Sequence, residues 1–181
     1  MASHPLPVID PARTEFGFSR TVCACHECTL YCRHLPGFLV PADLERLQQH
    51  LAPSEELRTW APRHLLASPG ALALRRGQPF RILTLVPARR PDGACLFLTD
   101  AEQCAIHAVS PFGCAFFDAH QPSAEADRRS QHGLQAVLEA WEARGPYARL
   151  WVELAGNGLA APAPEVARQQ LQRADDNERP Q

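Results

Sequence analysis

Several features that mark common protein classes are missing from these 181 residues. There is no block of Lys and Arg and the net charge is -2 at neutral pH, which argues against a surface for nucleic acid or anionic membranes. No apolar stretch approaches about 18 residues, so we expect no membrane-spanning helix. The first ten residues, MASHPLPVID, lack a basic start followed by an apolar run. We therefore expect no signal peptide and a cytoplasmic protein.

The motifs of several large enzyme classes are missing as well. The sequence contains no G-x-S-x-G, no phosphate-binding loop, no H-E-x-x-H helix and no internal repeat. Asp118 beside His120 resembles an acid–base pair, but this spacing is common by chance. Whether the protein is an enzyme therefore stays open at this stage.

Cysteine is the residue type that stands out. Of seven cysteines, four lie in the segment Val22–His34, which reads VCACHECTLYCRH. Thiols are kept reduced in the cytosol, so clustered cysteines there are interpreted as metal ligands or redox groups before disulfides. We therefore expect a metal ion as the main partner, and the sequence identifies no protein partner.

The spacing of the cysteines suits zinc. A tetrahedral zinc site normally combines two pairs of ligands from separate parts of the chain. Cys25 and Cys28 form a C-x2-C pair, and two of three later cysteines could complete the site: Cys95, Cys104 and Cys114. Four thiolates around zinc leave surplus negative charge, which nearby basic residues could offset: His26, Arg33 and His34.

The same residues also suit an iron–sulfur cluster. Cys25, Cys28 and Cys32 are spaced C-x2-C-x3-C, similar to the compact loops that bind such clusters. Cys23 and Cys25 can face one centre, since alternate residues of an extended chain point the same way. Seven thiols exceed the four that one zinc ion or one cluster requires. Two centres, or one centre with spare thiols, are both allowed.

Each candidate ligand has a simpler alternative. Cys95 lies in an apolar segment, where a lone cysteine usually fills the core. His107 and His120 are isolated histidines near the second cysteine group, and such residues are more often hydrogen-bonded surface or core residues. His26 and His34 fit better as hydrogen-bond donors to ligands than as ligands.

The apolar pattern predicts several helices. An early proline and leucines at helical spacing predict a helix over 41–51. Ser54 can cap a second helix, which Pro62 splits or kinks. Two amphipathic helices follow, one starting at Ser123 and one over 147–156.

Two short β-rich runs, 81–86 and 94–98, are separated by the turn-forming residues RRPDG and predict an antiparallel hairpin. The fold class is therefore α+β, a small and mostly helical domain with a short β-hairpin and irregular metal-binding loops. We expect an extended lead-in over 1–20, a single cysteine-cluster metal-binding domain over 21–158 and a flexible tail over 159–181.

Two stretches, FSRTVCACHECTLYCRHLPGFLVPADLERL and GACLFLTDAEQCAIHAVSPFGCAFFDAH, resemble the YkgJ-type cysteine-cluster proteins. These are bacterial-type CxxCxxCC domains described as zinc- or iron-chelating, and the resemblance covers Phe18 to His120. It implies metal binding by Cys23, Cys25, Cys28, Cys32, Cys95, Cys104 and Cys114. The chain departs from the family at Tyr31, because such clusters usually carry an adjacent pair of cysteines where this one reads Tyr31-Cys32. A family branch linked to lysine methylation is not carried over, since no methyl-donor motif is visible.

Three functions are compatible with the sequence. The first is a cytoplasmic protein that chelates zinc or iron, or an iron–sulfur cluster, through two cysteine groups. The second is an oxidoreductase or radical-type enzyme that uses an iron–sulfur cluster. The third is an interaction module that uses its metal only to hold the fold.

Overall fold

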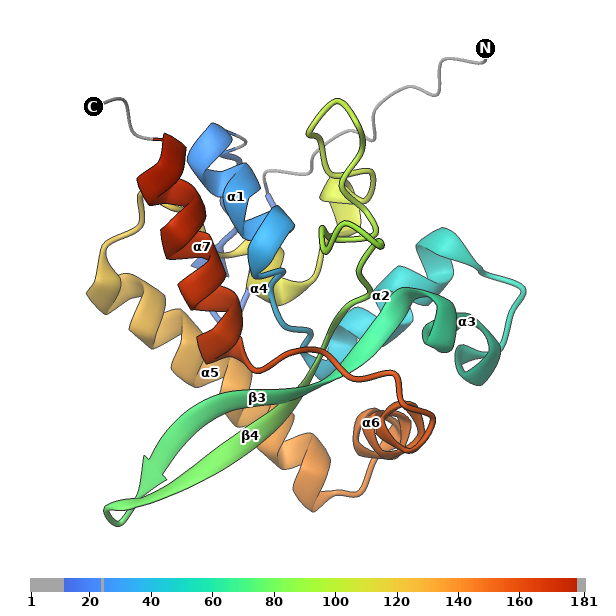
Figure 1. Ribbon diagram of the computed structural model, residues 1–181. Helices are drawn as coiled ribbons and strands as arrows, with labels where there is room; N and C mark the ends of the chain where they lie inside the picture. Colours follow the sequence, from blue (N-terminus) through green and yellow to red (C-terminus); the bar gives the residue numbers. More distant parts are fainter. Residues whose placement is uncertain (1–11, 24, 179–181) are drawn as a thin grey trace.

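The computed structural model describes residues 12–23 and 25–178, which form seven α-helices, one 3-10 helix and two antiparallel hairpins (Figure 1). The predicted α+β class is confirmed. None of the helices in this part of the chain is long and apolar enough to cross a membrane. The helices are α1 (His26–His34), α2 (Pro41–Leu51), α3 (Leu57–His64), α4 (Phe112–Ala115), α5 (Ser123–Glu142), α6 (Pro146–Gly156) and α7 (Pro164–Glu178). The other elements are β1 (Thr14–Glu15), β2 (Phe18–Ser19), β3 (Leu65–Arg75), β4 (Gln78–Pro87) and the 3-10 helix η1 (His107–Val109).

Most predicted helices are present. The one predicted over 41–51 is α2, and those expected from Ser123 and over 147–156 are α5 and α6. The helix expected after Ser54 begins only at Leu57, and it includes Pro62 without being split. Because α1 is helical, Cys28 and Cys32 lie on a helix and not in the predicted irregular loop.

The central hairpin, β3 and β4, crosses the middle of the molecule (Figure 1). Arg76 and Gly77 between the strands both have positive φ, 52° and 77°, which suits the tight two-residue turn of a hairpin. The register shifts between Ser68 and Ala71. Gly70 is required at this shift, because its φ is +69° and a Cβ there would lie 1.8 Å from the carbonyl oxygen of Ile82.

The predicted pairing of 81–86 with 94–98 is wrong. Residues 81–86 lie in β4, but their partner is β3, because the two-residue turn closes that hairpin within a shorter loop than RRPDG would. The segment 94–98 forms only isolated bridges, one between Arg89 and Cys95 and one between Leu98 and Cys104.

The chain after Leu159 also differs from the expectation of a flexible tail. Residues 164–178 form α7, which packs against α1 and β3 and contains the fully buried Ala167. Figure 1 shows α1 and α7 side by side above the hairpin. The predicted boundaries between lead-in, domain and tail stay a prediction, and residues 1–11 of the lead-in lie outside the described residues.

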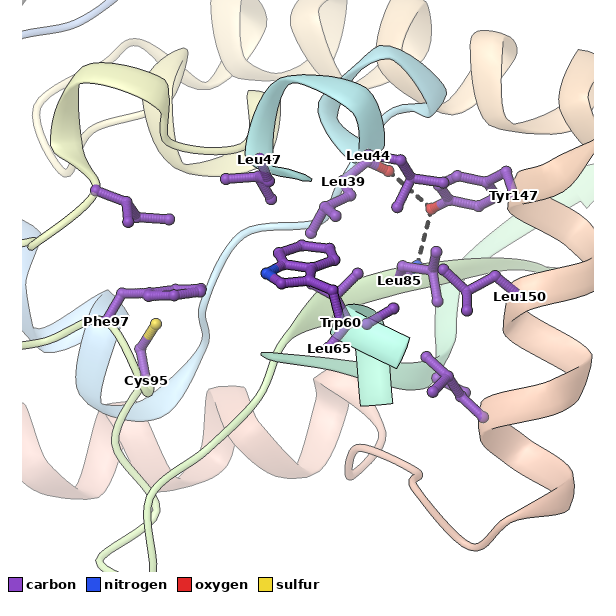
Figure 2. Close-up of a cluster of buried hydrophobic side chains, with 14 of the residues drawn as sticks. Leu39, Leu44, Leu47, Trp60, Leu65, Leu85, Cys95, Phe97, Tyr147 and Leu150 are labelled. Carbon is purple, nitrogen blue, oxygen red and sulfur yellow. Dashed lines mark hydrogen bonds between the residues drawn. The ribbon is translucent and has the colours of Figure 1, made fainter. Parts of the chain in front are cut away.

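The main core lies where α2, α3 and α6 meet the hairpin (Figure 2). Trp60 is fully buried at its centre, together with Leu39 and Leu85. The buried Tyr147 hydroxyl donates a hydrogen bond to the carbonyl oxygen of Leu39 at 2.7 Å and accepts one from the backbone N–H of Leu85 at 2.8 Å. These bonds join α6, β4 and the segment before α2. Each large apolar side chain buried here contributes roughly 1.5–3 kcal/mol.

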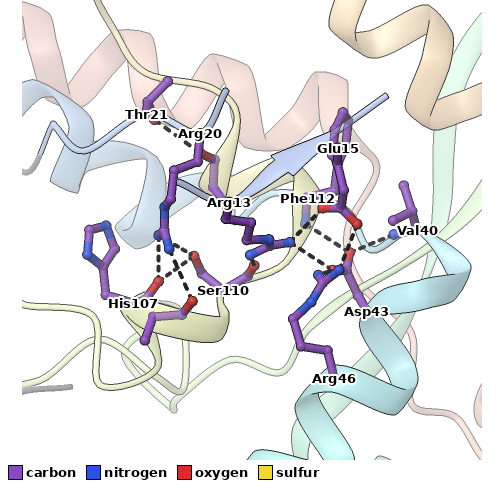
Figure 3. A network of polar contacts seen from close by, with 12 residues as sticks. Arg13, Glu15, Arg20, Thr21, Val40, Asp43, Arg46, His107, Ser110 and Phe112 are labelled. Atoms are coloured by element: carbon purple, nitrogen blue, oxygen red, sulfur yellow. Dashed lines mark hydrogen bonds and ion pairs between the residues drawn. The ribbon is translucent and has the colours of Figure 1, made fainter. Parts of the chain in front are cut away.

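A buried carboxylate links α2 to α4 (Figure 3). Asp43 accepts hydrogen bonds from the backbone N–H groups of Val40 and Phe112, both at 2.8 Å, and its side chain is also paired with Arg46. Burial raises the pKa of Asp43 to about 6, more than these hydrogen bonds and the positive charge of Arg46 lower it. The carboxylate therefore fixes the start of α4, two residues before Cys114.

Two arginines of the N-terminal segment hold the chain between Cys104 and Cys114 (Figure 3). Arg20 donates to the carbonyl oxygens of His107 and Ala108 at 2.6 and 3.1 Å, and Arg13 donates to that of Ser110 at 2.6 Å. This segment has little regular structure, so these bonds define its course.

Candidate metal centre

Four potential metal ligands converge at the start of α1. The ligand atoms of this group all lie within 4.8 Å of one another, and in the described part of the chain no other set of three or more His, Cys, Asp and Glu residues meets this condition. The sulfur of Cys25 is 3.1 Å from Nε2 of His120. We call this group the outer site: Cys23, Cys25, Cys28 and His120.

The three cysteines owe their positions to the beginning of α1. Cys25 immediately precedes the helix with an extended backbone, φ -72° and ψ 171°, and Cys28 lies in the first helical turn. The backbone therefore changes from extended to helical between these two residues, and their sulfurs meet beside the start of the helix. Cys23 joins them as expected for a residue two positions before Cys25 in the sequence.

His120 arrives from the loop between α4 and α5. Thr21 ties the two segments together, because its backbone N–H donates to the carbonyl oxygen of Ala115 at 2.8 Å. Closer to the site, the backbone N–H of Ala119 lies 3.4 Å from the sulfur of Cys28, and that of His120 donates to Asp118 Oδ1 at 2.9 Å. These contacts fix the loop immediately before the side chain of His120.

The charges at the outer site favour a thiolate. The backbone N–H of Cys28, followed by the side chain of His120, lowers the pKa of Cys25 to about 6. The hydrogen bond with Cys25 raises the pKa of His120, whose Nε2 also lies 3.4 Å from Glu27 Oε2. Burial raises the pKa of Cys28 to about 12. A metal ion would bind all of these groups in their deprotonated form, so its binding would release protons.

The donor set fits a thiophilic metal. Three thiol sulfurs and one imidazole nitrogen form a Cys3His set, which occurs in tetrahedral zinc sites. The cysteines are partly exposed and His120 is exposed, so an ion can reach the site from solvent.

The other four predicted ligands lie elsewhere. Cys32 is one helical turn beyond Cys28, Cys95 and Cys104 lie between β4 and η1, and Cys114 lies in α4. We call them the inner thiol group. Both groups border one cavity of about 890 Å³, whose lining includes Cys23, Cys28, Cys32, Cys95, Cys104 and Cys114. The structure therefore brings together three of the seven predicted ligands at the outer site, and metal binding by the inner four stays a prediction.

Sequence analysis missed the ligand position of His120. It interpreted this residue as an ordinary histidine. The only signal for metal binding by His120 was its closeness in the sequence to Cys114. The basic residues expected to offset charge also have other contacts: Arg33 forms an ion pair with Glu102, and the carbonyl oxygen of His34 accepts a hydrogen bond from Arg89. Tyr31 is exposed on α1 and is not part of the outer site.

Comparisons with known proteins add no assignment: no protein-family model matches the sequence, and neither a curated protein nor a solved structure matches it. The outer site is a cysteine cluster that could hold a metal, and such a cluster does not by itself identify the YkgJ-type family.

Proposed function

We propose that this protein binds a transition metal ion at the outer site and that the ion joins the start of α1 to the loop before α5. The observation that carries the proposal is the convergence of three thiols and one imidazole, with all ligand atoms within 4.8 Å. These donors come from two segments far apart in the sequence, so an ion bound to all four would link them.

Zinc is the first candidate for this site and iron is the second. Thiolate and imidazole donors select zinc or iron over hard cations such as magnesium. With four protein donors, a tetrahedral zinc ion would have no open position for water or substrate, which is the arrangement of structural zinc and not of catalytic zinc. The proposed role is therefore metal binding, without a reaction at this centre.

We also propose that the protein is located in the cytoplasm, a reducing compartment. All seven cysteines are free thiols, and thiols remain free where glutathione and thioredoxin keep them reduced. Membership of the YkgJ-type family is part of the same proposal, and the sequence resemblance supports it.

Elemental analysis of purified variants tests the outer site. We expect Cys25→Ser, Cys28→Ser and His120→Ala each to lose most of the metal bound there, because each removes one of four ligands. His50→Ala is the matched control, since His50 is an exposed histidine on α2 away from the site, and it should retain the metal. Unchanged metal content in Cys25→Ser and His120→Ala would refute the assignment.

A further inference from the structure

We infer that Cys32 and Cys95 are a redox-modification site, at which a peroxide converts the two thiols into a reversible disulfide bond. Cys32 lies near the end of α1, and Cys95 lies in the segment after β4. The inference goes beyond the proposed function, because it concerns two thiols outside the outer site and a reaction that involves no metal ion.

A direct backbone hydrogen bond joins the two residues. In a longer helix the carbonyl oxygen of Cys32 would accept a hydrogen bond from the N–H of residue 36, but that residue is Pro36, which has no N–H. The oxygen instead accepts a bond from the N–H of Cys95, at 2.8 Å. No other pair of inner cysteines, all four of which the structure describes, is joined in this way.

Arg89 fixes the same junction by a second route. Its guanidinium group donates a hydrogen bond to the carbonyl oxygen of His34 at 2.8 Å, at the end of α1. The backbone of Arg89 forms an antiparallel bridge with Cys95. Two contacts therefore set the position of the segment after β4 relative to α1, and with it the position of Cys95 relative to Cys32.

This junction places the Cα atoms of the two cysteines at a separation that suits a disulfide. Given standard bond lengths, the 2.8 Å hydrogen bond keeps the Cα atoms of Cys32 and Cys95 at most about 6.7 Å apart. Disulfides join residues whose Cα atoms lie about 4.4–6.8 Å apart. The backbone is therefore already suitably placed, and the movement that remains is rotation of the two side chains.

The cavity beside these residues gives their side chains room and an oxidant access. Both cysteines border this cavity, which has a volume of about 890 Å³. Its lining also includes the exposed residues Tyr31 and Glu102, so the cavity opens to solvent. Cys95 is buried, whereas Cys32 is only partly buried against the same core. A cysteine that only fills a core needs neither a second thiol beside it nor a cavity at its side.

Burial limits how fast the two thiols react. It raises the pKa of Cys32 above its ordinary value and that of Cys95 to about 12. The charge of Cys32 also raises the pKa of Cys95, as expected for neighbouring thiols, and the charge of Arg89 lowers it. Because the thiolate is the reactive form, we expect the pair to stay reduced during brief exposure to peroxide and to close during sustained exposure.

The reaction balances with hydrogen peroxide as the oxidant. The sulfur of Cys32, the less buried thiol, attacks one peroxide oxygen and becomes a sulfenic acid, and the O–O bond breaks. The departing hydroxide takes up the thiol proton and leaves as water. The sulfur of Cys95 then attacks the sulfenic sulfur, so that the S–S bond forms, the S–O bond breaks and a second water leaves with the proton of Cys95. Two thiols are oxidised to one disulfide, and the peroxide gains two electrons.

The test is peptide mapping of the full chain after incubation with hydrogen peroxide that fully oxidises added glutathione. Chymotrypsin cleaves after aromatic residues, which places Cys32 and Cys95 in separate peptides that contain no other cysteine. We expect a product that joins these two peptides, lighter than their sum by two hydrogen atoms, and its release by dithiothreitol. Cys32→Ser and Cys95→Ser should each abolish this product. Cys114→Ser, which changes another inner cysteine, is the matched control and should retain it.

The outcomes also separate this inference from the proposed function. Free thiols at Cys32 and Cys95 after the incubation would overturn the inference, whether core packing or a bound metal ion protects them. A product that joins either residue to Cys104 or Cys114 would overturn it as well. His120→Ala should lose the outer-site metal and still form the disulfide. If this variant keeps its metal, the proposed outer site fails but the disulfide stands. The wild-type map needs no variant, so the inference can be refuted even if the cysteine variants do not fold.

Discussion

The outer site and the inner thiol group differ in how the chain assembles them. Three of the four outer ligands lie within six positions of one another, at the start of one helix, and their sulfurs are close together. The inner thiols come from α1, from the long segment after β4 and from α4, and they line a cavity. The outer site thus depends mainly on local structure, whereas the inner group depends on the whole fold. Changes to the framework should therefore affect the inner group more.

The largest effect is expected for Asp43→Ala. The backbone N–H groups of Val40 and Phe112 would lose their acceptor, which costs about 1–3 kcal/mol for each buried group. We expect the free energy of unfolding in urea to fall by about 2–6 kcal/mol. Glu45→Ala, at an exposed position on the same helix, should change it by less than about 0.5 kcal/mol. Equal effects of the two changes would show that Asp43 does not fix α4.

The stability of the metal-free protein should depend on pH through the same carboxylate. The folded pKa of Asp43 is raised from 3.8 to about 6, so the folded state holds more protons than the unfolded state between these values. Its contribution to stability is complete below about pH 4 and is lost as pH rises through about 6, by up to about 3 kcal/mol in total. Urea denaturation across this range should show the decline, and Asp43→Asn should abolish it. A wild-type and variant with the same pH profile would contradict the assignment.

Gly113→Ala should show directly whether the outer site and the inner thiol group differ in their dependence on the framework. A Cβ at Gly113 would meet the backbone of Phe38, so α4 must shift away from the chain after α1, at about 1–3 kcal/mol of stability. We expect the inner thiols of this variant to react faster with a thiol reagent, while the protein retains most of the outer-site metal. Gly156→Ala is the control, because a Cβ there has no neighbour within 4 Å. Loss of most of the outer-site metal from Gly113→Ala would indicate that the outer site depends on the framework as much as the inner group does.

The smallest effect is expected for Tyr31→Phe. Tyr31 is exposed, and its hydroxyl group is not among the donors of the outer site. Metal content should stay unchanged, and the free energy of unfolding should change by less than about 0.5 kcal/mol. A clear loss of metal in elemental analysis would show that the hydroxyl group of Tyr31 contributes to metal binding.

The sequence predicts the helices better than it predicts the pairing of segments. Helices α2, α5 and α6 follow from apolar residues at helical spacing, which is a local signal. The partner of β4 was missed because RRPDG gives a stronger turn signal than the Arg76-Gly77 pair that closes the hairpin. α7 was missed because its sequence contains few core residues, and it is stabilised by contacts with α1 and β3.

The candidate site shows the same difference between local signals, which the sequence reveals, and long-range contacts, which it does not. Cysteine spacing places Cys23, Cys25 and Cys28 in one cluster together with Cys32, and the first three do lie together because they are close in the sequence. Nothing in the spacing points to His120, which the Thr21 contact with Ala115 brings to the site from a distant loop. Nor does it show that Cys32 lies with the later cysteines, since that depends on the backbone contact between Cys32 and Cys95.

Helix α1 carries a residue of each group, Cys28 and Cys32, on the same face one turn apart. A metal ion at the outer site would hold the first turn of this nine-residue helix, so its amide protons would exchange with solvent more slowly when the ion is bound. Hydrogen exchange along α1, and along α7 packed against it, would therefore report the occupancy of the outer site.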